Sequence, residues 1–366
     1  MNDDIYKIAL SLLPKVGALT ARRLVAYAGS AEALFKDSKK NLLRIPNLGN
    51  VIADQIISGT VLKMAEEELV KIEKSGYNFY YFLDKNYPIR LRQCEDAPVV
   101  IFSKGEIKEP DKIVSIVGTR HPSEYGKQLC NELVKDLSEK VSDLQIVSGL
   151  AYGIDVTAHR AAIDNKLNNI AVLGHGLHMI YPASHRSISE KILENGTLIT
   201  EFSSQKKPDP GNFVSRNRII AGLADITIVV ESATKGGALL TADFAFSYNR
   251  EVAAFPGKVT DKYSGGCNMI IKQNKAALIE NADDVIKLMN WPVIGESKPK
   301  QHLLFNELTE DEEALIGFLS EQEQLSLDEL SVKSSKPLSL LKSELLNLEF
   351  KGIVKSLPGN AFKLIS

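Results

Sequence analysis

Short apolar segments alternate with segments of helical length across residues 112–289, and this alternation limits the possible folds more than any other feature of the chain. Each apolar segment is rich in valine and isoleucine and ends in glycine or a small residue. Strands of this kind belong to a parallel sheet that is buried on both faces. In chain order they are IVSIVG, LQIVSG, NIAVLGHG, TLITEF, ITIVVES and EVAAFPG. We therefore predict an α/β domain with a Rossmann-like parallel sheet.

Four glycine turns follow these strands, at the sheet edge where open α/β sheets carry their sites. The first turn, Gly118-Thr119-Arg120, combines amide and hydroxyl donors with a planar guanidinium before a helix N-terminus that favours anions. The others lie at residues 148–155, 174–176 and 235–238. Each turn taken singly is equally explained by chain packing. As a set, they predict a broad polyanion-binding face.

The glycine spacing argues against nucleotide cofactors. Gly118, Gly149 and Gly153 do not have the GxGxxG spacing of a dinucleotide site, and the sequence contains no GxxxxGK[ST] loop for a triphosphate. We expect no cofactor.

A further segment, after a proline-rich loop, combines basic residues with an aromatic residue. It contains Phe213, Arg216, Asn217 and Arg218. Arginines beside an aromatic ring suit backbone phosphates and a stacked base. The alternative is that one of the two arginines pairs with a nearby carboxylate such as Glu201 or Glu231.

Six successive blocks of the chain resemble the DNA-processing protein A family (DprA, also called Smf). They are SIVGTRHPSEYGK, IVSGLAYGIDVTAHRAAI, IAVLGHGLHMIYPASHR, FVSRNRIIAGLADITIVVESATKGGALLTADFA, REVAAFPG and SGGCNMIIKQNKAALIENADDV. The resemblance implies an extended Rossmann fold and a homodimer without enzymatic activity. It also implies that the protein binds single-stranded DNA, protects it and loads RecA recombinase onto it during natural transformation.

The resemblance also assigns roles to residues. Arg120 matches the DNA-facing arginine of the family's glycine-serine/threonine-arginine motif, and Arg186 falls in a variable basic segment. His178 departs from the family, which usually has an acidic residue there, and alters the local charge near neutral pH. The predicted DNA-binding residues are Gly118, Thr119, Arg120, Ser148, Gly149, Arg186, Phe213, Arg216, Asn217, Arg218, Lys235, Gly236 and Gly237.

The net charge of the chain does not indicate DNA binding. The 366 residues include 44 Lys and Arg against 46 Asp and Glu, a net charge of −2. A protein that coats DNA through a positive potential over its whole surface carries an excess of basic residues, which this chain lacks. Binding must therefore come from a local patch of arginines.

Other features predict an intracellular protein without a metal site. Cys94, Cys130 and Cys267 have no CxxC spacing, so neither a disulfide framework nor structural zinc is expected. The acidic start and the interruption by Pro14 argue against a signal peptide, and no apolar run reaches membrane-spanning length. We expect a cytoplasmic protein with no membrane span.

Two smaller domains flank the sheet. Residues 1–70 predict a helical domain in which residues 13–17 and 45–49 repeat the pattern apolar-Pro-x-apolar-Gly. The repeat resembles helix-hairpin-helix elements that present amides to DNA phosphates, and a SAM-like helical bundle packed through glycine turns explains it equally well. Strands near residues 77–82 and 97–102 extend the central domain to 77–289.

The C-terminal region changes in composition. Residues 290–305 are rich in proline, serine and lysine and predict a linker. Residues 306–366 follow with three helices and a strand pair, in the order of a winged helix. The third helix of such a domain often enters a DNA major groove, but the mixed charges here suit a protein contact equally well.

Two other classes of function are alternatives, a nucleotide-hydrolysing enzyme and a purely structural module. A nucleotide phosphoribohydrolase of the lysine-decarboxylase-like group would need a carboxylate such as Glu231, Glu201 or Asp155. That group places its key glutamate after the glycine pair, whereas Glu231 precedes it. A purely structural module leaves the arginines at the strand ends unexplained. Salt-dependent binding of single strands and release of a free base distinguish these classes.

Overall fold

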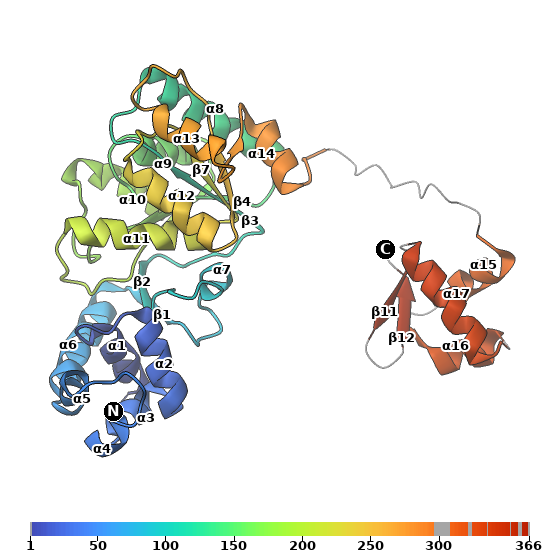
Figure 1. The fold of residues 1–366 in the computed structure, drawn as a ribbon, viewed down its shortest axis with the longest axis horizontal. Helices are drawn as coiled ribbons and strands as arrows, with labels where there is room; N and C mark the ends of the chain where they lie inside the picture. Colours follow the sequence, from blue (N-terminus) through green and yellow to red (C-terminus); the bar gives the residue numbers. More distant parts are fainter. Residues whose placement is uncertain are drawn as a thin grey trace. The chain divides into compact units, whose positions relative to one another are not determined.

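The computed structural model describes residues 2–295, 308–320, 324–334, 336–351, 353–357 and 361–364. These residues form two compact units, Met1–Ile294 and Gly295–Ser366, and each is described by itself (Figure 1).

A nine-stranded sheet organises the first unit, in the order β1-β2-β6-β5-β4-β3-β7-β8-β9. Its strands are β1 (Asn78–Tyr81), β2 (Val100–Lys104), β3 (Lys112–Val117), β4 (Leu144–Ser148), β5 (Asn168–Val172), β6 (Gly196–Thr200), β7 (Ile226–Val229), β8 (Glu251–Ala254) and β9 (Ala277–Leu278). The six predicted strands pair in parallel, whereas β1 and β2 run antiparallel at one edge. The predicted extended Rossmann-like sheet is confirmed.

Helices cover both faces of this sheet. They are α7 (Ile89–Arg92), α8 (Glu124–Lys140), α9 (Ile154–Asp164), α10 (Arg186–Asn195), α11 (Pro210–Leu223), α12 (Gly237–Ser247), α13 (Gly265–Lys272) and α14 (Ala282–Met289). Alternate residues of β3 divide between two cores: Ile113 and Val117 pack on the α11–α12 side, and Val114 and Ile116 on the α8–α9 side. Burial on both faces explains the nearly continuous apolar strands.

The N-terminal helices pack onto the antiparallel edge of the sheet. They are α1 (Asp3–Leu12), α2 (Ala18–Ala28), α3 (Ala31–Lys36), α4 (Lys39–Leu42), α5 (Asn50–Ile57) and α6 (Thr60–Ser75). The repeated sequence pattern forms the same turn twice. Lys15 and Asn47 have matching positive φ angles of 63° and 64°, and Gly17 and Gly49 are the N-caps of α2 and α5.

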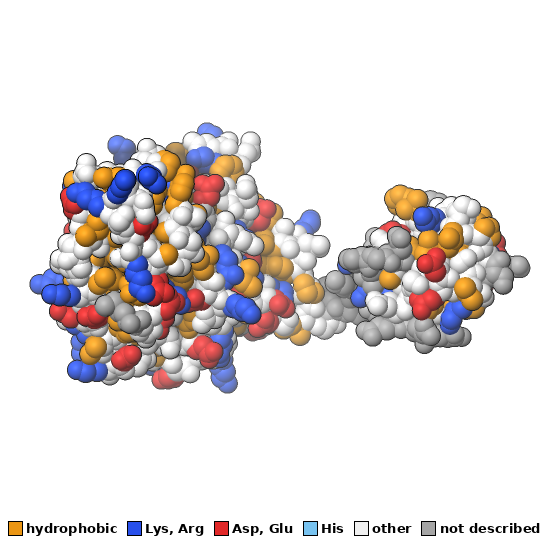
Figure 2. Space-filling model, turned by 90° about the horizontal axis from the view of Figure 1, so that it is seen from below, with side chains coloured by type: hydrophobic (Ala, Val, Ile, Leu, Met, Phe, Trp, Pro, Cys, Tyr) orange, Lys and Arg blue, Asp and Glu red, His pale blue; other side chains and the backbone are white. Residues whose placement is uncertain are grey.

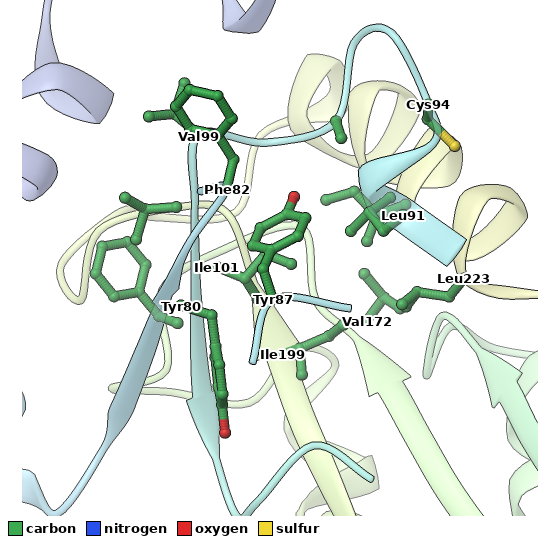
Figure 3. Close-up of a cluster of buried hydrophobic side chains, with 14 of the residues drawn as sticks. Tyr80, Phe82, Tyr87, Leu91, Cys94, Val99, Ile101, Val172, Ile199 and Leu223 are labelled. Carbon is green, nitrogen blue, oxygen red and sulfur yellow. The ribbon is translucent and has the colours of Figure 1, made fainter. Parts of the chain in front are cut away.

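One apolar core joins these helices to the sheet. Phe82, Tyr87, Val99 and Ile101 are buried between the antiparallel edge and the end of α11, where Leu223 meets them (Figure 3). The phenol of Tyr87 is fully buried and donates a hydrogen bond to the Pro98 carbonyl at 2.7 Å. The aromatic strand residues therefore serve packing.

The second unit has the element order of a winged helix. It contains α15 (Glu310–Ser320), β10 (Leu325–Ser326), α16 (Leu327–Ser334), α17 (Leu338–Phe350), β11 (Val354–Leu357) and β12 (Ala361–Leu364), with sheet order β10-β12-β11. Lys336, at the start of α17, forms ion pairs with Asp311 and Glu344. Most of the predicted linker and the turn at 358–360 lie outside the described residues.

The surface carries no single-sign field on the face shown in Figure 2, where basic and acidic side chains are interspersed. Among the described residues, no helix combines the length and the apolar character needed to cross a bilayer. Cys94, Cys130 and Cys267 are buried free thiols.

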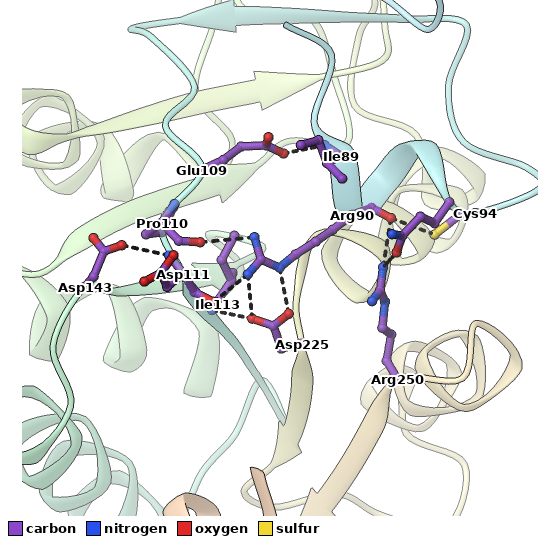
Figure 4. Close-up of polar contacts among 11 residues, drawn as sticks. Ile89, Arg90, Cys94, Glu109, Pro110, Asp111, Ile113, Asp143, Asp225 and Arg250 are labelled. Atoms are coloured by element: carbon purple, nitrogen blue, oxygen red, sulfur yellow. Dashed lines mark hydrogen bonds and ion pairs between the residues drawn. The ribbon is translucent and has the colours of Figure 1, made fainter. Parts of the chain in front are cut away.

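A polar network fixes α7 to the amino ends of β3 and β7 (Figure 4). Arg90 donates from Nε and Nη2 to the two carboxylate oxygens of Asp225, at 2.7 and 3.0 Å, and from Nη2 to the Asp111 carbonyl at 2.7 Å. Asp225 also accepts the Ile113 amide at 2.8 Å. This bidentate pair lies at the amino ends of the strands, whereas the glycine turns follow their carboxyl ends.

We expect Arg90→Ala to lower the free energy of unfolding by about 2–4 kcal/mol, because it leaves the largely buried Asp225 carboxylate without its charge partner. Urea unfolding measures the change. Lys275→Ala, which breaks the more exposed pair with Asp243, is the control and should cost less than about 1 kcal/mol. Equal effects of the two substitutions would contradict this account.

Candidate functional site

A cavity lies at the point where the strand order reverses. The chain builds β4, β5 and β6 on one side of β3 and then returns to place β7 on its other side. Loops leaving β3 and β7 therefore diverge and leave a crevice at the carboxyl ends of the strands. A cavity of about 650 Å³ occupies this place, lined by the turn after β3, the first half of α11 and the turn into α12.

Arg120 is the exposed cation at the rim of this cavity. The preceding turn is rigid, because the Thr119 amide donates to the Glu231 carbonyl at 2.7 Å and the Thr119 carbonyl accepts from the Ile154 amide at 3.2 Å. A Cβ on Gly118 would lie 2.5 Å from a side-chain carbon of Ile154, so only glycine fits there. The turn presents Arg120 from a fixed backbone.

Arg216 is a buried cation in the lining of the cavity, with 3% of its surface exposed. Its Nη1 donates to the Gly149 carbonyl at 2.6 Å and to the Val172 carbonyl, and its Nε has no partner among the described residues. Burial lowers its pKa to about 10, which leaves it charged at neutral pH. Asp155 also lines the cavity, and burial raises the pKa of its carboxyl while Arg216 opposes the rise.

Two aromatic rings lie against each other in the cavity wall. Phe213 and Tyr181 have ring centroids 5.6 Å apart, and Tyr181 is 48% exposed. Phe213 rests on Gly174, where a Cβ would lie 2.6 Å from the ring. The sequence prediction included Phe213 but missed Tyr181, for which the only signal is an aromatic residue before proline in the loop that follows the third glycine turn.

The N-terminus of α12 faces the same cavity. Gly236 and Gly237 both line it, and Gly237 has open space where a Cβ would stand. Asn217 from α11 lines it beside them and donates to the Gly237 carbonyl at 3.5 Å. The Gly236 amide donates to the Ala233 carbonyl at 2.9 Å, so Gly237 begins the part of the N-terminus that faces the cavity. The site therefore combines a guanidinium, a helix N-terminus and two rings.

Several predicted residues do not line the cavity. Ser148 is fully buried and donates to the Ile116 carbonyl at 2.6 Å, and Gly149 is buried against Arg216, so both support the site from below. Arg218 points away, because its guanidinium pairs with Glu201 and donates to the Asp96 carbonyl at 2.6 Å. One of the two arginines thus pairs with a carboxylate, as the alternative prediction held.

Other predicted residues are exposed outside the cavity lining. They are Arg186 at the start of α10 and Lys235 before α12. His178, which departs from the family, is exposed outside the lining as well.

Two of the carboxylates considered for hydrolysis are engaged in packing. Glu231 accepts hydrogen bonds from the Ser123 amide at 2.9 Å and the Ser123 hydroxyl at 2.5 Å, and Glu201 holds Arg218. A Cβ on Gly126 would lie 2.4 Å from the Glu231 carboxylate. Glu231 therefore fixes the start of α8.

We expect Gly149→Ala to destabilise the protein by about 1–3 kcal/mol, because the new methyl group would lie 2.1 Å from Nη1 of Arg216. The control is Gly237→Ala, where nothing lies within 4 Å and the change should stay within about 1 kcal/mol. Chemical unfolding of both variants measures the difference. Unchanged stability of Gly149→Ala would show that Arg216 does not occupy this position.

We expect stability to fall by about 2–3 kcal/mol between pH 6.5 and pH 4 because of His159. This buried ring accepts the Leu150 amide at Nε2 and lies 2.6 Å from Asn169 through Nδ1, and burial lowers its pKa from 6.5 to about 4. The unfolded chain therefore takes up a proton at a higher pH than the folded chain. Urea unfolding across this window should show a shallower decline for His159→Gln, and parallel declines would contradict the assignment.

Comparison with known families gives two matches along the chain. The family model for DNA recombination-mediator protein A matches residues 78–290, and the model for the DprA winged helix domain matches residues 303–360. The first match contains the whole nine-stranded sheet and every residue of the cavity.

Curated relatives cover most of the chain. A DNA processing protein DprA from Streptococcus pneumoniae is 37% identical over 288 residues, which are 78% of this chain and 97% of the relative. A putative DNA processing protein DprA from Mycobacterium tuberculosis is 30% identical over 353 residues, 92% of this chain and 88% of the relative.

Two solved structures share the fold. The DprA structure from Streptococcus pneumoniae has a TM-score of 0.68 at 28% identity and covers 78% of this chain and 98% of its own. DNA processing protein A from Helicobacter pylori, described for its single-stranded DNA binding mode, has a TM-score of 0.53 at 27% identity and covers 59% of this chain and 97% of its own.

Proposed function

Because this chain belongs to the DNA recombination-mediator protein A family, we propose that it binds single-stranded DNA at the cavity between β3 and β7. One observation carries the proposal: Arg120, the amide end of α12 and the Phe213–Tyr181 pair line one cavity although they come from separate segments of the chain. The single-stranded DNA binding described for the Helicobacter pylori relative supports the same ligand.

Each group has a role in this proposal. Arg120 contacts a phosphate directly, and the amide of Gly237 donates to a phosphate oxygen at the positive end of the α12 dipole. Arg216 adds a buried positive charge in the cavity lining. Phe213 and Tyr181 offer ring faces to a base, which only an unpaired strand can present. Such contacts tolerate any sequence, because all nucleotides share a phosphate and a flat base.

We extend the proposal to the wider role that the family name supports, mediation of recombination. In it, a homodimer of this protein in the cytoplasm protects incoming single strands and loads RecA recombinase onto them during natural transformation. The protein acts there by binding, without an enzymatic step. The engagement of Glu231 by Ser123 favours this over hydrolysis of a nucleotide.

The test is fluorescence anisotropy of a labelled single-stranded oligonucleotide with the wild type and Arg120→Ala. Loss of one charge-assisted phosphate contact should weaken binding about tenfold or more at 0.1 M salt. The slope of log K against log salt should become shallower by about 0.7. Duplex competitor should displace little of the labelled single strand.

Arg160→Ala is the matched control, because Arg160 is an exposed arginine of α9 outside the cavity lining. It should leave affinity nearly unchanged. If the wild type does not bind the oligonucleotide and instead releases free base from a nucleotide, the protein is a phosphoribohydrolase and this proposal is wrong. Equal losses in the two variants would remove the site from the cavity.

A further inference from the structure

The loop between β6 and α11, residues 201–209, carries two exposed lysines beside the cavity. We propose that Lys206 and Lys207 extend the phosphate-binding surface beyond the cavity, and that Glu68 of the N-terminal helices is the positioning residue that holds their loop. The inference rests on the proposed function and adds both a binding surface and a role for the helical region.

The loop leads directly into the cavity wall. Pro208 and Asp209 line the cavity immediately after the lysines, and Asp209 caps α11 by accepting the Gly211 amide at 2.9 Å. The Lys206 carbonyl accepts the Gly176 amide at 2.8 Å, which ties the loop to the turn after β5. A strand leaving the aromatic pair on this side therefore passes the two lysines.

Both lysine charges are available. Neither Lys206 nor Lys207 takes part in an ion pair within the part of the chain that the structure describes. Arg218 of α11, by contrast, is paired with Glu201. Exposed lysines without acidic partners gain affinity for a polyanion by releasing its counterions.

Glu68 anchors the loop from the helical region. Its carboxylate is 4% exposed and accepts both the Ser204 amide and the Ser204 hydroxyl, the latter at 2.8 Å. Its neighbours Glu66 and Glu67 on α6 are exposed, as expected for a solvated helix face. A carboxylate this deeply buried needs these bonds, because an unpartnered charge there is costly.

A second contact reaches the adjoining loop. The Tyr77 hydroxyl, which follows α6, donates to the Leu177 carbonyl at 3.1 Å. The two loops are packed without a gap, since a Cβ on Gly176 would lie 2.3 Å from the carbonyl oxygens of Ser203 and Ser204. The helical region thus holds both loops that flank the aromatic pair and affects DNA binding without touching DNA.

The first experiment compares the full-length wild type with K206A/K207A by anisotropy on single-stranded DNA. Affinity should fall about three- to tenfold at 0.1 M salt, and the salt slope should become shallower by up to about 1.4, from about 0.7 for each phosphate contact. K63A/K74A removes the same charge from exposed positions of α6 and should leave binding unchanged.

The second experiment asks whether Glu68 acts through the lysines. E68A should weaken binding in the wild-type background and cause no further loss in the K206A/K207A background, whereas E68Q, which can still bond Ser204, should restore most of the affinity. S204A removes only the hydroxyl contact and should give a smaller loss of affinity. If E68A does not fold, the affinity of S204A tests the role of Glu68 in its place. Thermal melting establishes which variants are folded.

The outcomes separate the two proposals. Absence of wild-type binding defeats the proposed function itself. Wild-type binding that is lost in Arg120→Ala but equal in K206A/K207A and K63A/K74A overturns the lysine surface alone. An additive effect of E68A in the background lacking both lysines overturns the positioning role of Glu68.

Discussion

The buried guanidinium of Arg216 joins the carboxyl ends of β4 and β5 to α11, and the shape of the cavity depends on this contact. A buried charge is tolerated only where hydrogen bonds replace water, and the Gly149 and Val172 carbonyls supply them at the strand ends. Because residues three and four apart share a helix face, the same contact turns Phe213, Asn217 and Ile220 of α11 toward the cavity. Gly149 is required because any side chain would occupy the place of the guanidinium.

Arginines close together in sequence have different roles here. Arg216 supports the sheet edge, and Arg218, only two residues along α11, is held by Glu201 on another face. Arg120 keeps its charge at the surface because its turn is fixed by backbone bonds that leave the side chain free. A chain with a net charge of −2 can therefore present a local cationic site, since charges elsewhere are paired or interspersed with acids.

The helical region and the sheet behave as one body. They share a continuous apolar core around Tyr87, and polar contacts from Glu68 and Tyr77 reach the loops beside the cavity. At the opposite end of the strands from the cavity, the pair between Arg90 and Asp225 fixes the amino ends of β3 and β7.

The amino-acid sequence by itself determined the strands, the glycine turns between strands and helices, the winged-helix order and the exposed Arg120, because each depends on local periodicity or on the conformational freedom of glycine. It also limited the site to one edge of the sheet. Only the tertiary structure decided that Ser148 and Arg218 lie outside the cavity lining, that Tyr181 joins Phe213, and that Glu68 bonds Ser204 across 136 residues of chain. The direction of a side chain depends on what packs against it, and those neighbours come from distant segments whose approach no local pattern encodes.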